Sequence, residues 1–398
     1  MPSTLVLLYG PPGSGKSTLI KNLALEPYTV SYDRMRELFS PALPTTEGLV
    51  RPMPYRTVQR LAVEATHAQA ESLMSLGSFV VVDNTNLSGR ARKPWRDLAR
   101  RYGYQVVVVD TLGDLSLEDL LERDPYRPDL ERVGEATVRR MYAETLKNPS
   151  EKNSFWSVET FAQWLKAKEK DGNRLKRSAD SRPVHIVGDI HSHSKPLARA
   201  IEDLDPDGED TWVFLGDLFD RGPDPVGVYD LVLDLPDREI IIGNHDRNII
   251  RLSADLGDGK GLHQTRDTLG KLRDANRKVE SLYKYATAWL TVKNEDTRAT
   301  YYLSHGGVPP ANFSFFTPDH LFINGYNNKA DTYRGGTTYE CMGDLSISPR
   351  DYVIHGHRKY GRVGNTLSLD TEGDGTVLVA TIHPDNPEPD VRRYGHAE

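Results

Sequence analysis

Two groups of residues in this 398-residue chain have the types and spacings needed for phosphate chemistry. Residues 10–17 read Gly-Pro-Pro-Gly-Ser-Gly-Lys-Ser, the spacing of a loop that binds nucleoside triphosphates. From Asp189 onward, Asp-x-His, Gly-Asp-x-x-Asp-Arg-Gly and Gly-Asn-His-Asp follow in the order expected of a two-metal site that hydrolyses phosphate esters. The sequence therefore predicts two phosphate-handling sites with opposite chemical purposes.

The glycine-rich loop is expected to bind ATP with Mg²⁺. Its glycines let backbone N–H groups converge on phosphate oxygens, and the helix that follows adds a favourable dipole. Lys16 should reach the β and γ phosphates during transfer, and the Ser17 hydroxyl should bind Mg²⁺. The nucleotide-binding residues predicted in this loop are Gly10, Gly13, Ser14, Gly15, Lys16, Ser17 and Thr18.

Residues after the next two strands could serve the group that accepts the phosphate. Asp33 could take the proton from an attacking hydroxyl as a general base, and Arg36, one turn later, could hold an acceptor phosphate. An aspartate that caps a helix, beside a solvated arginine, is the alternative for this pair. Asp83 could line the same cleft or hold Mg²⁺ through water, and a simple turn at the strand end is its alternative.

Three arginines lie around a proline-broken segment further along the chain. Arg123, Arg127 and Arg132 could close over ATP and neutralise the charge that develops in phosphoryl transfer. A charged surface loop would have the same composition. Of the three, Arg123 and Arg127 are predicted to bind the nucleotide.

Together these features resemble the kinase module of the polynucleotide 5′-hydroxyl kinase family, over roughly residues 5–147. The resemblance implies that Asp33 is the general base and that Arg36 binds the acceptor phosphate. The match is looser at the arginine-bearing lid, because Gly134 stands where relatives often carry proline.

The second group of motifs supplies ligands for two divalent metals. Asp189 and His191 offer a carboxylate and an imidazole to one metal, and Asp217 can bridge both. Such mixed oxygen and nitrogen ligation suits Mn²⁺, Fe or Zn²⁺, with Mn²⁺ the expected metal. The residues predicted to complete the second metal are Asn244, His305 and His357.

Three further residues are predicted to act on the phosphate ester. His245 is the natural acid for the leaving group, Asp220 would orient it, and Arg221 can grip the phosphate. The whole set resembles the calcineurin-type metallophosphoesterase superfamily over about residues 183–382, with the departure that Ser192 replaces a usual glycine. His193 and His355 are additional histidines near this site.

The elements that position these residues indicate two α/β domains. Apolar, β-branched runs alternate with helically spaced segments in the first part, which indicates a parallel sheet with helices on both faces. In the second part each predicted strand ends in a metal-type motif, at the carboxyl end where open α/β sheets place their sites. We expect a P-loop kinase domain at 1–150, a helix and linker at 151–182, and a metallophosphoesterase α/β sandwich at 183–398.

Bulk composition limits the classes of function. The hydrophobic content is 38% and the formal net charge is −7, which argues against a chain that coats nucleic acid but allows a local basic site. No apolar run approaches the roughly 20 residues that span a bilayer. The single cysteine, Cys341, fits a reducing compartment, so we expect a cytoplasmic protein. The sequence gives no indication of the oligomeric state.

The order of the two domains resembles bacterial and phage polynucleotide kinase–phosphatases. That resemblance implies phosphorylation of a 5′-OH and removal of a 3′-phosphate or a 2′,3′-cyclic phosphate, on RNA or possibly DNA ends that a separate ligase then joins. Two alternatives stay open at this point. One is a small-molecule kinase fused to a dinucleoside polyphosphate hydrolase, and the other is a phosphatase controlled by ATP binding.

Overall fold

A computed structural model of the chain describes residues 4–46, 48–127, 131–147, 149–171, 174–177, 182–255, 261–308, 315–325 and 350–395. Its internal contacts divide the chain into two compact units, Ser3–Lys168 and Glu169–Glu398, the latter joined by the first two residues. Cys341 lies outside the described residues. No helix within the described ranges is long and apolar enough to cross a membrane.

The first unit is built on a five-stranded sheet in the order β2-β5-β1-β6-β7, and every pairing in it is parallel. A separate hairpin pairs β3 with β4. The strands are β1 (Thr4–Tyr9), β2 (Thr29–Val30), β3 (Leu43–Thr45), β4 (Gly48–Val50), β5 (Val80–Val82), β6 (Gln105–Asp110) and β7 (Trp156–Ser157). The helices are α1 (Lys16–Asn22), α2 (Tyr32–Phe39), α3 (Tyr55–Ser75), α4 (Gly89–Arg101), α5 (Leu117–Arg123), α6 (Glu135–Thr145), α7 (Pro149–Lys152) and α8 (Val158–Asp171).

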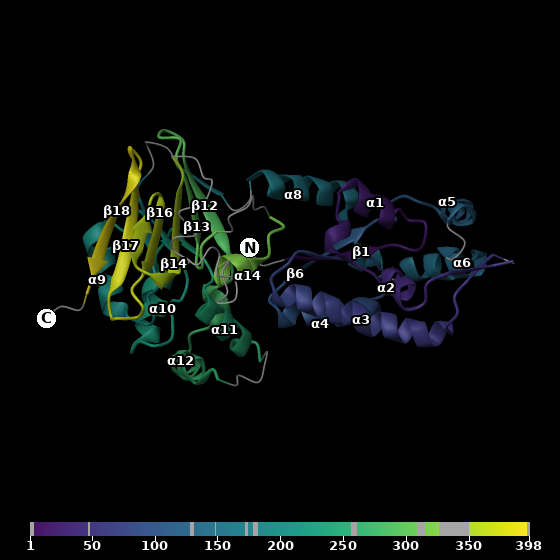
Figure 1. Cartoon of the computed structure of the whole chain (residues 1–398), viewed down its shortest axis with the longest axis horizontal. Helices are drawn as coiled ribbons and strands as arrows, with labels where there is room; N and C mark the ends of the chain where they lie inside the picture. Colours follow the sequence, from purple (N-terminus) through teal and green to yellow (C-terminus); the bar gives the residue numbers. More distant parts are fainter. Residues whose placement is uncertain are drawn as a thin grey trace. The chain divides into compact units, whose positions relative to one another are not determined.

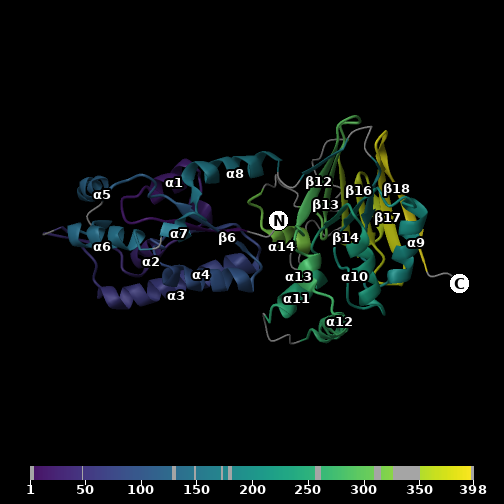
Figure 2. The same ribbon diagram turned by 180° about the vertical axis from the view of Figure 1, so that it is seen from behind.

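Helices cover both faces of this sheet. Because side chains alternate along a strand, Leu5 and Leu7 of β1 point to the face where they join Ala70 of α3 and Trp95 of α4 in one apolar core. Figures 1 and 2 both show α3 and α4 on one side of the sheet and α1 and α8 on the other. The helix α8 buries Phe161 completely, so it packs within this unit.

The second unit contains two sheets, of five strands in the order β11-β10-β9-β17-β18 and of six in the order β15-β16-β14-β13-β12-β8. The strands are β8 (Arg174–Arg177), β9 (Val184–Val187), β10 (Thr211–Phe214), β11 (Arg238–Ile240), β12 (Trp289–Asn294), β13 (Thr300–Ser304), β14 (Tyr352–Lys359), β15 (Gly361–Val363), β16 (Thr366–Asp370), β17 (Val377–His383) and β18 (Asn386–Tyr394). The helices are α9 (Ser194–Leu204), α10 (Pro225–Asp234), α11 (Asn244–Ser253), α12 (His263–Asp274), α13 (Val279–Leu282) and α14 (Asp319–Ile323).

The two sheets pack face to face with helices outside. Ile186 of β9 and Ala380 of β17 share one apolar core with Tyr301 of β13 and Ile354 of β14, so this core lies between the sheets. Helices α9 to α13 cover the outer face of the five-stranded sheet (Figure 1). Phe322 of α14 packs on the outer face of the other sheet against Val353. The predicted fold class, a parallel α/β domain followed by an α/β sandwich, is confirmed.

Candidate functional site

The loop between β1 and α1 is built on glycines with left-handed backbone. Gly10, Gly13 and Gly15 have φ angles of 155°, 84° and 95°, which side chains rarely tolerate. A Cβ on Gly10 would lie 2.3 Å from Ser14 Oγ and 2.6 Å from Thr111 Oγ1. These two hydroxyls are hydrogen bonded at 2.7 Å, so the loop is tied to the residue that follows β6.

Lys16 lies at the inner side of this loop. Its ammonium donates to the carbonyls of Gly10 at 2.8 Å and Pro11 at 3.0 Å. Burial lowers the pKa of Lys16 to about 8, the carboxylate of Asp83 opposes this shift, and the guanidinium of Arg127 adds to it. Lys16, Asp83 and Arg127 therefore lie within electrostatic reach of one another.

Asp83 follows the last residue of β5, and its backbone N–H donates to the Val30 carbonyl of β2 at 2.9 Å. Burial raises the pKa of Asp83, while Lys16 acts against that shift. Ser17 and Thr18 are exposed in the first turn of α1. The structure thus places the predicted Mg²⁺-binding hydroxyl on an accessible surface.

Asp33 and Arg36 lie on one face of α2. Ser31 caps this helix and accepts from the Asp33 backbone N–H at 3.2 Å, so Asp33 is the second residue of the helix and not its cap. The Asp33 side chain is 73% exposed and forms an ion pair with Arg36, whose own side chain is 19% exposed. Arg36 also donates to Gln59 of α3. The capping alternative for Asp33 is therefore wrong.

A cleft of about 960 Å³ connects this pair with the glycine-rich loop and the arginine-bearing segment. Pro12 of the loop and Asp33 and Arg36 of α2 line it, together with Arg127 and Arg132. Lys16, Asp83 and Arg123 are not among its lining residues.

Arg123 ends α5 above the loop, where its guanidinium donates to the Gly13 carbonyl at 3.2 Å. Arg127 forms ion pairs with Asp124 at 3.6 Å and Glu131 at 3.5 Å. Both arginines predicted to bind nucleotide therefore lie beside the loop, one on its backbone and the other facing the cleft.

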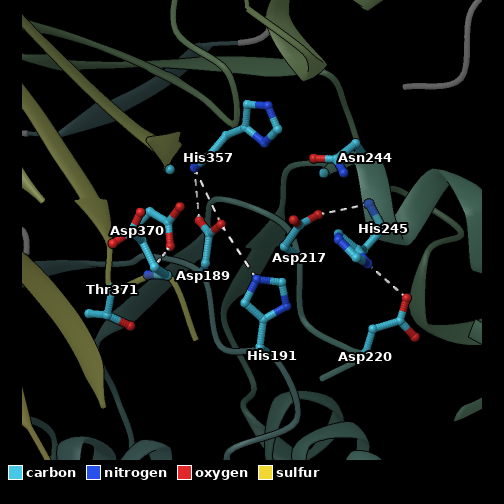
Figure 3. Close-up of polar contacts among 12 residues, drawn as sticks. Asp189, His191, Asp217, Asp220, Asn244, His245, His357, Asp370 and Thr371 are labelled. Atoms are coloured by element: carbon cyan, nitrogen blue, oxygen red, sulfur yellow. Dashed lines mark hydrogen bonds and ion pairs between the residues drawn. The ribbon is translucent and has the colours of Figure 1, made fainter. Parts of the chain in front are cut away.

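In the second unit, the predicted metal ligands converge from five strand ends. Asp189 follows β9, Asp217 follows β10, Asn244 opens the helix after β11, His305 follows β13, and His357 lies in β14. The candidate ligand atoms of Asp217, His305 and His357 lie within 4.8 Å of one another, as do those of Asp189, His191 and Asp217. Figure 3 shows side chains of this set gathered around Asp189 and Asp217. Because Asp217 belongs to both groups, it is placed where a bridging ligand is needed.

The donor set fits two divalent cations. The His191 ring is held by a 3.1 Å contact between Nδ1 and the Phe219 carbonyl, and its buried Nε2 has no hydrogen-bond partner in the described part of the chain. Burial lowers the pKa of His191 to about 4 and that of His357 to about 3, so both rings are neutral, as metal ligands must be. Burial would also lower the pKa of His305, but the Asp217 and Asp189 carboxylates raise it to about 10. The cluster thus attracts positive charge.

The backbone of this site is strained at the reactive residues. The φ angles of His191, Asp217, Asp220, Arg221 and His357 are 48°, 50°, 70°, 56° and 58°. Non-glycine residues seldom adopt the left-handed region, and such conformations persist when surrounding contacts over-determine them. The strain is consistent with a site built for function.

His245 is oriented by a network around Asp220. Its Nδ1 lies 2.8 Å from Asp220 Oδ2, which also accepts from Thr265 at 2.7 Å, while the other oxygen accepts from Thr268 at 2.8 Å. Burial acts to lower the pKa of His245, but the hydrogen bond with Asp220 and the charges of the Asp217 and Asp220 carboxylates together outweigh it, so the pKa is raised. Of the additional histidines, His355 and His193 are both buried beside the site.

Two aspartates at this site escaped the sequence analysis. Asp246 is fully buried and accepts hydrogen bonds from the backbone of Asp217 at 2.7 Å, Gly243 at 2.9 Å and the Tyr283 hydroxyl at 2.6 Å. Its place in Gly-Asn-His-Asp was the signal that could have revealed it. Asp370, at the end of β16, lies near Asp189 in Figure 3 and had no motif to mark it.

Family comparisons match the two units separately. Residues 5–146 match the family described as an AAA domain, and residues 182–379 match the calcineurin-like phosphoesterase family. The chain therefore joins a kinase-like domain to a calcineurin-like metallophosphoesterase domain, and the predicted fusion is confirmed.

Three curated relatives are similar to parts of the chain. A symmetrical bis(5′-nucleosyl)-tetraphosphatase of Legionella pneumophila is 38% identical over 72 residues, 18% of this chain and 26% of the relative. The asymmetrical bis(5′-nucleosyl)-tetraphosphatase PrpE of Geobacillus thermodenitrificans is 26% identical over 51% of this chain and 91% of the relative. A "Putative bifunctional polynucleotide kinase/RNA ligase" of Autographa californica nuclear polyhedrosis virus is 30% identical over 36% of this chain and 21% of the relative. The chain thus spans about a quarter of the first of these proteins.

Proposed function

We propose that this fusion of a kinase-like domain and a metallophosphoesterase domain heals nucleic-acid ends. It would transfer the γ-phosphate of ATP to a 5′-OH and remove a 3′-phosphate or 2′,3′-cyclic phosphate, with RNA as the expected substrate and DNA as the other option. The observation that carries the proposal is the cleft in which Asp33, Arg36 and Arg127 lie together beside the glycine-rich loop. A domain that only senses ATP has no need of an acceptor base.

In the transfer reaction, residues of the cleft and of the adjoining glycine-rich loop have distinct tasks. The Asp33 carboxylate accepts the proton of the 5′-OH as that oxygen attacks the γ-phosphorus and the bond to ADP breaks. Arg36, released from its ion pair with Asp33, holds a phosphate of the acceptor strand. Lys16 and Arg127 neutralise the charge on the transferred phosphoryl group, and Ser17 would hold Mg²⁺.

At the metal centre, the protein residues position the ester and supply a proton. Asp189, His191, Asp217, Asn244, His305 and His357 would hold two divalent metals, Mn²⁺ being the expected ion, and these supply Lewis acidity for ester hydrolysis. Arg221 holds a phosphate oxygen. As water attacks the phosphorus and the bond to the leaving oxygen breaks, His245, oriented by Asp220, gives its proton to that oxygen.

The kinase step is tested by transfer from γ-labelled ATP to a short 5′-OH RNA, with Asp33→Ala beside the wild type. We expect label on the wild-type product and a loss of about 100- to 10,000-fold in the variant. The variant should still bind ATP, which shows that the first unit is folded, and it should keep its hydrolysis of a phosphate monoester. Equal transfer by both proteins would rule out Asp33 as the base.

A second candidate function is hydrolysis of dinucleoside polyphosphates by the second unit. It is favoured by the alignment with PrpE, which extends over 91% of that relative. In this case the kinase-like unit would act on a small nucleotide or nucleoside. Diadenosine tetraphosphate and RNA bearing a 2′,3′-cyclic phosphate, assayed at equal concentrations, separate the two possibilities by their kcat/KM.

A further inference from the structure

The cleft beside Asp33 has one wall made of exposed apolar side chains. Leu49 and Val50 of the β3–β4 hairpin and Tyr55 at the start of α3 line it. The Tyr55 ring is 68% exposed although it lies where the acceptor must enter. An exposed aromatic ring beside a phosphate-transfer site is a feature that the proposed chemistry does not itself require.

Tyr55 is close to the residue that would hold the acceptor phosphate. The guanidinium carbon of Arg36 lies 5.9 Å from the centre of the Tyr55 ring. Arg36 in turn pairs with Asp33, so base, phosphate-binding arginine and aromatic ring follow one another along one wall. This succession matches a nucleotide, in which a hydroxyl, a phosphate and a flat base are linked at short distances.

The hairpin wall is anchored to α2. Arg51, which follows β4, donates to the Ser40 carbonyl at 2.6 Å and forms an ion pair with Glu37 at 2.5 Å. The backbone N–H of Met53 donates to Ser40 Oγ at 3.3 Å. These bonds hold the segment just before α3 against α2, so Tyr55 is presented from a supported position.

The charge of the cleft fits a nucleic-acid strand. Its described lining includes three carboxylates (Asp33, Glu37 and Glu131) against five guanidinium groups, those of Arg34, Arg36, Arg51, Arg127 and Arg132. The cleft is therefore net positive, by 5 − 3 = 2, in a chain whose formal charge is −7. Single-stranded nucleic acid is typically bound by a positive groove whose aromatic side chains stack with bases.

We propose that Tyr55 is the stacking platform for the terminal base of a single-stranded 5′ end, and that it sets the preference of the kinase for nucleotide acceptors over smaller alcohols. The inference rests on the proposed function. Stacking requires only the ring face, so Tyr55→Phe retains it and Tyr55→Ala removes it. The ring is largely exposed and its truncation leaves no buried cavity, so the alanine variant should fold.

The test measures kcat/KM for a 5′-OH RNA oligonucleotide and for the same strand with an abasic 5′ nucleotide. For the wild type, we expect the intact strand to be used roughly tenfold better, within the range of base–aromatic stacking. Tyr55→Ala should lose about that factor on the intact strand and nothing on the abasic one, with an unchanged KM for ATP. Tyr55→Phe should restore the preference.

A matched control is Tyr285→Ala in the second unit, since Tyr285 is 74% exposed and carries the Lys284 ammonium 5.0 Å from its ring centre. This variant should phosphorylate both strands as the wild type does. Equal losses on the two strands in Tyr55→Ala, or a wild type indifferent to the terminal base, would overturn the stacking role. A wild type that phosphorylates small alcohols but neither strand would overturn the proposed function as well.

Discussion

The metal centre and the kinase-side cleft differ in how the fold holds their reactive groups. Asp189 and Asp217 are 2% and 1% exposed, and the buried Asp246 accepts hydrogen bonds from the backbone of Asp217 and Leu218. Asp33, by contrast, has a side chain that is 73% exposed, and this side chain forms an ion pair with the neighbouring Arg36. The metal centre is thus organised by buried contacts, whereas in the cleft the Asp33 carboxylate and the Arg36 guanidinium neutralise each other.

This difference follows from the chemistry of each site. The free-energy cost of burying several carboxylates together is offset when cations bind to them. The positions of the ligand atoms must therefore be fixed for both metal ions. Phosphoryl transfer instead depends on positioning two substrates, so part of the site must remain open to receive them. Substitutions should therefore have larger effects at the metal centre than at the supports of the cleft.

The largest effect is expected from Asp217→Ala. The carboxylate belongs to both candidate ligand groups, so its loss should lower hydrolysis of a phosphate ester by at least about 1000-fold. Transfer from ATP should change less than about twofold, because Asp217 lies in the other compact unit. Asp203→Ala, which removes a surface carboxylate, serves as the control. If Asp217→Ala abolished both activities while folded, the two sites would not be independent.

Metal removal should affect the two units unequally. Saturating Mn²⁺ at about 100 times its Kd stabilises the binding unit by about 2.7 kcal/mol, which corresponds to a Tm rise of roughly 5–10 °C for a unit of this size. Calorimetry should compare the chelated protein with the same protein after Mn²⁺ is added. The rise in Tm should appear in one of the two unfolding transitions, and Asp217→Ala should lose it. Equal shifts in both transitions would contradict a metal site confined to the second unit.

A smaller effect is expected from Asp220→Asn. The carboxylate raises the pKa of His245 against the effect of burial, so the amide should let that pKa fall. In the proposed mechanism His245 gives its proton to the leaving group. Hydrolysis should then be lost as pH rises through this pKa, and the alkaline limb of the pH profile of the variant should move to lower pH. The accompanying loss of kcat should be about 10- to 100-fold. An unmoved limb would assign the proton to another group.

The smallest effect is expected from Ser31→Ala, which removes the cap of α2. The free energy of unfolding of the first unit should fall by about 1 kcal/mol, measured by urea denaturation. Because Asp33 donates this bond through its backbone N–H and not through its carboxylate, the KM for the 5′-OH strand should rise by about fivefold or less. Ser31→Asp, which can also cap the helix, should restore both values. A loss as large as that of Asp33→Ala would mean that the cap belongs to the catalytic machinery.

The sequence was sufficient to predict the position of a site residue where its motif directly follows a buried strand. The strands before Gly10, Asp189 and Asp217 are buried along their whole length and mostly apolar, and parallel pairing brings the motifs to one edge of each sheet. The strand β18 was not predicted because it contains two prolines and is mostly exposed at the edge of a sheet. Its pairing with β17, and not an apolar pattern of its own, makes it a strand.

Within the sites, side chains that belong to a recognisable motif were predicted, and those outside any motif were not. Asp370 has no recognisable motif, and the hydroxyls of Thr265 and Thr268 reach Asp220 from a helix more than 40 residues away in sequence. The wall that contains Tyr55 escaped notice for a similar reason. Its residues line the cleft only because the β3–β4 hairpin folds next to α2, and no sequence motif marks that arrangement.

The most direct test of the account uses one RNA that carries a 5′-OH and a 2′,3′-cyclic phosphate, incubated with ATP, Mg²⁺ and Mn²⁺. Mass spectrometry should show a product with a 5′-phosphate and a free 3′ end. Asp33→Ala should fail to phosphorylate the 5′-OH, and Asp217→Ala should fail to remove the cyclic phosphate. An RNA unchanged at both ends, under conditions in which the wild type hydrolyses diadenosine tetraphosphate, would contradict it.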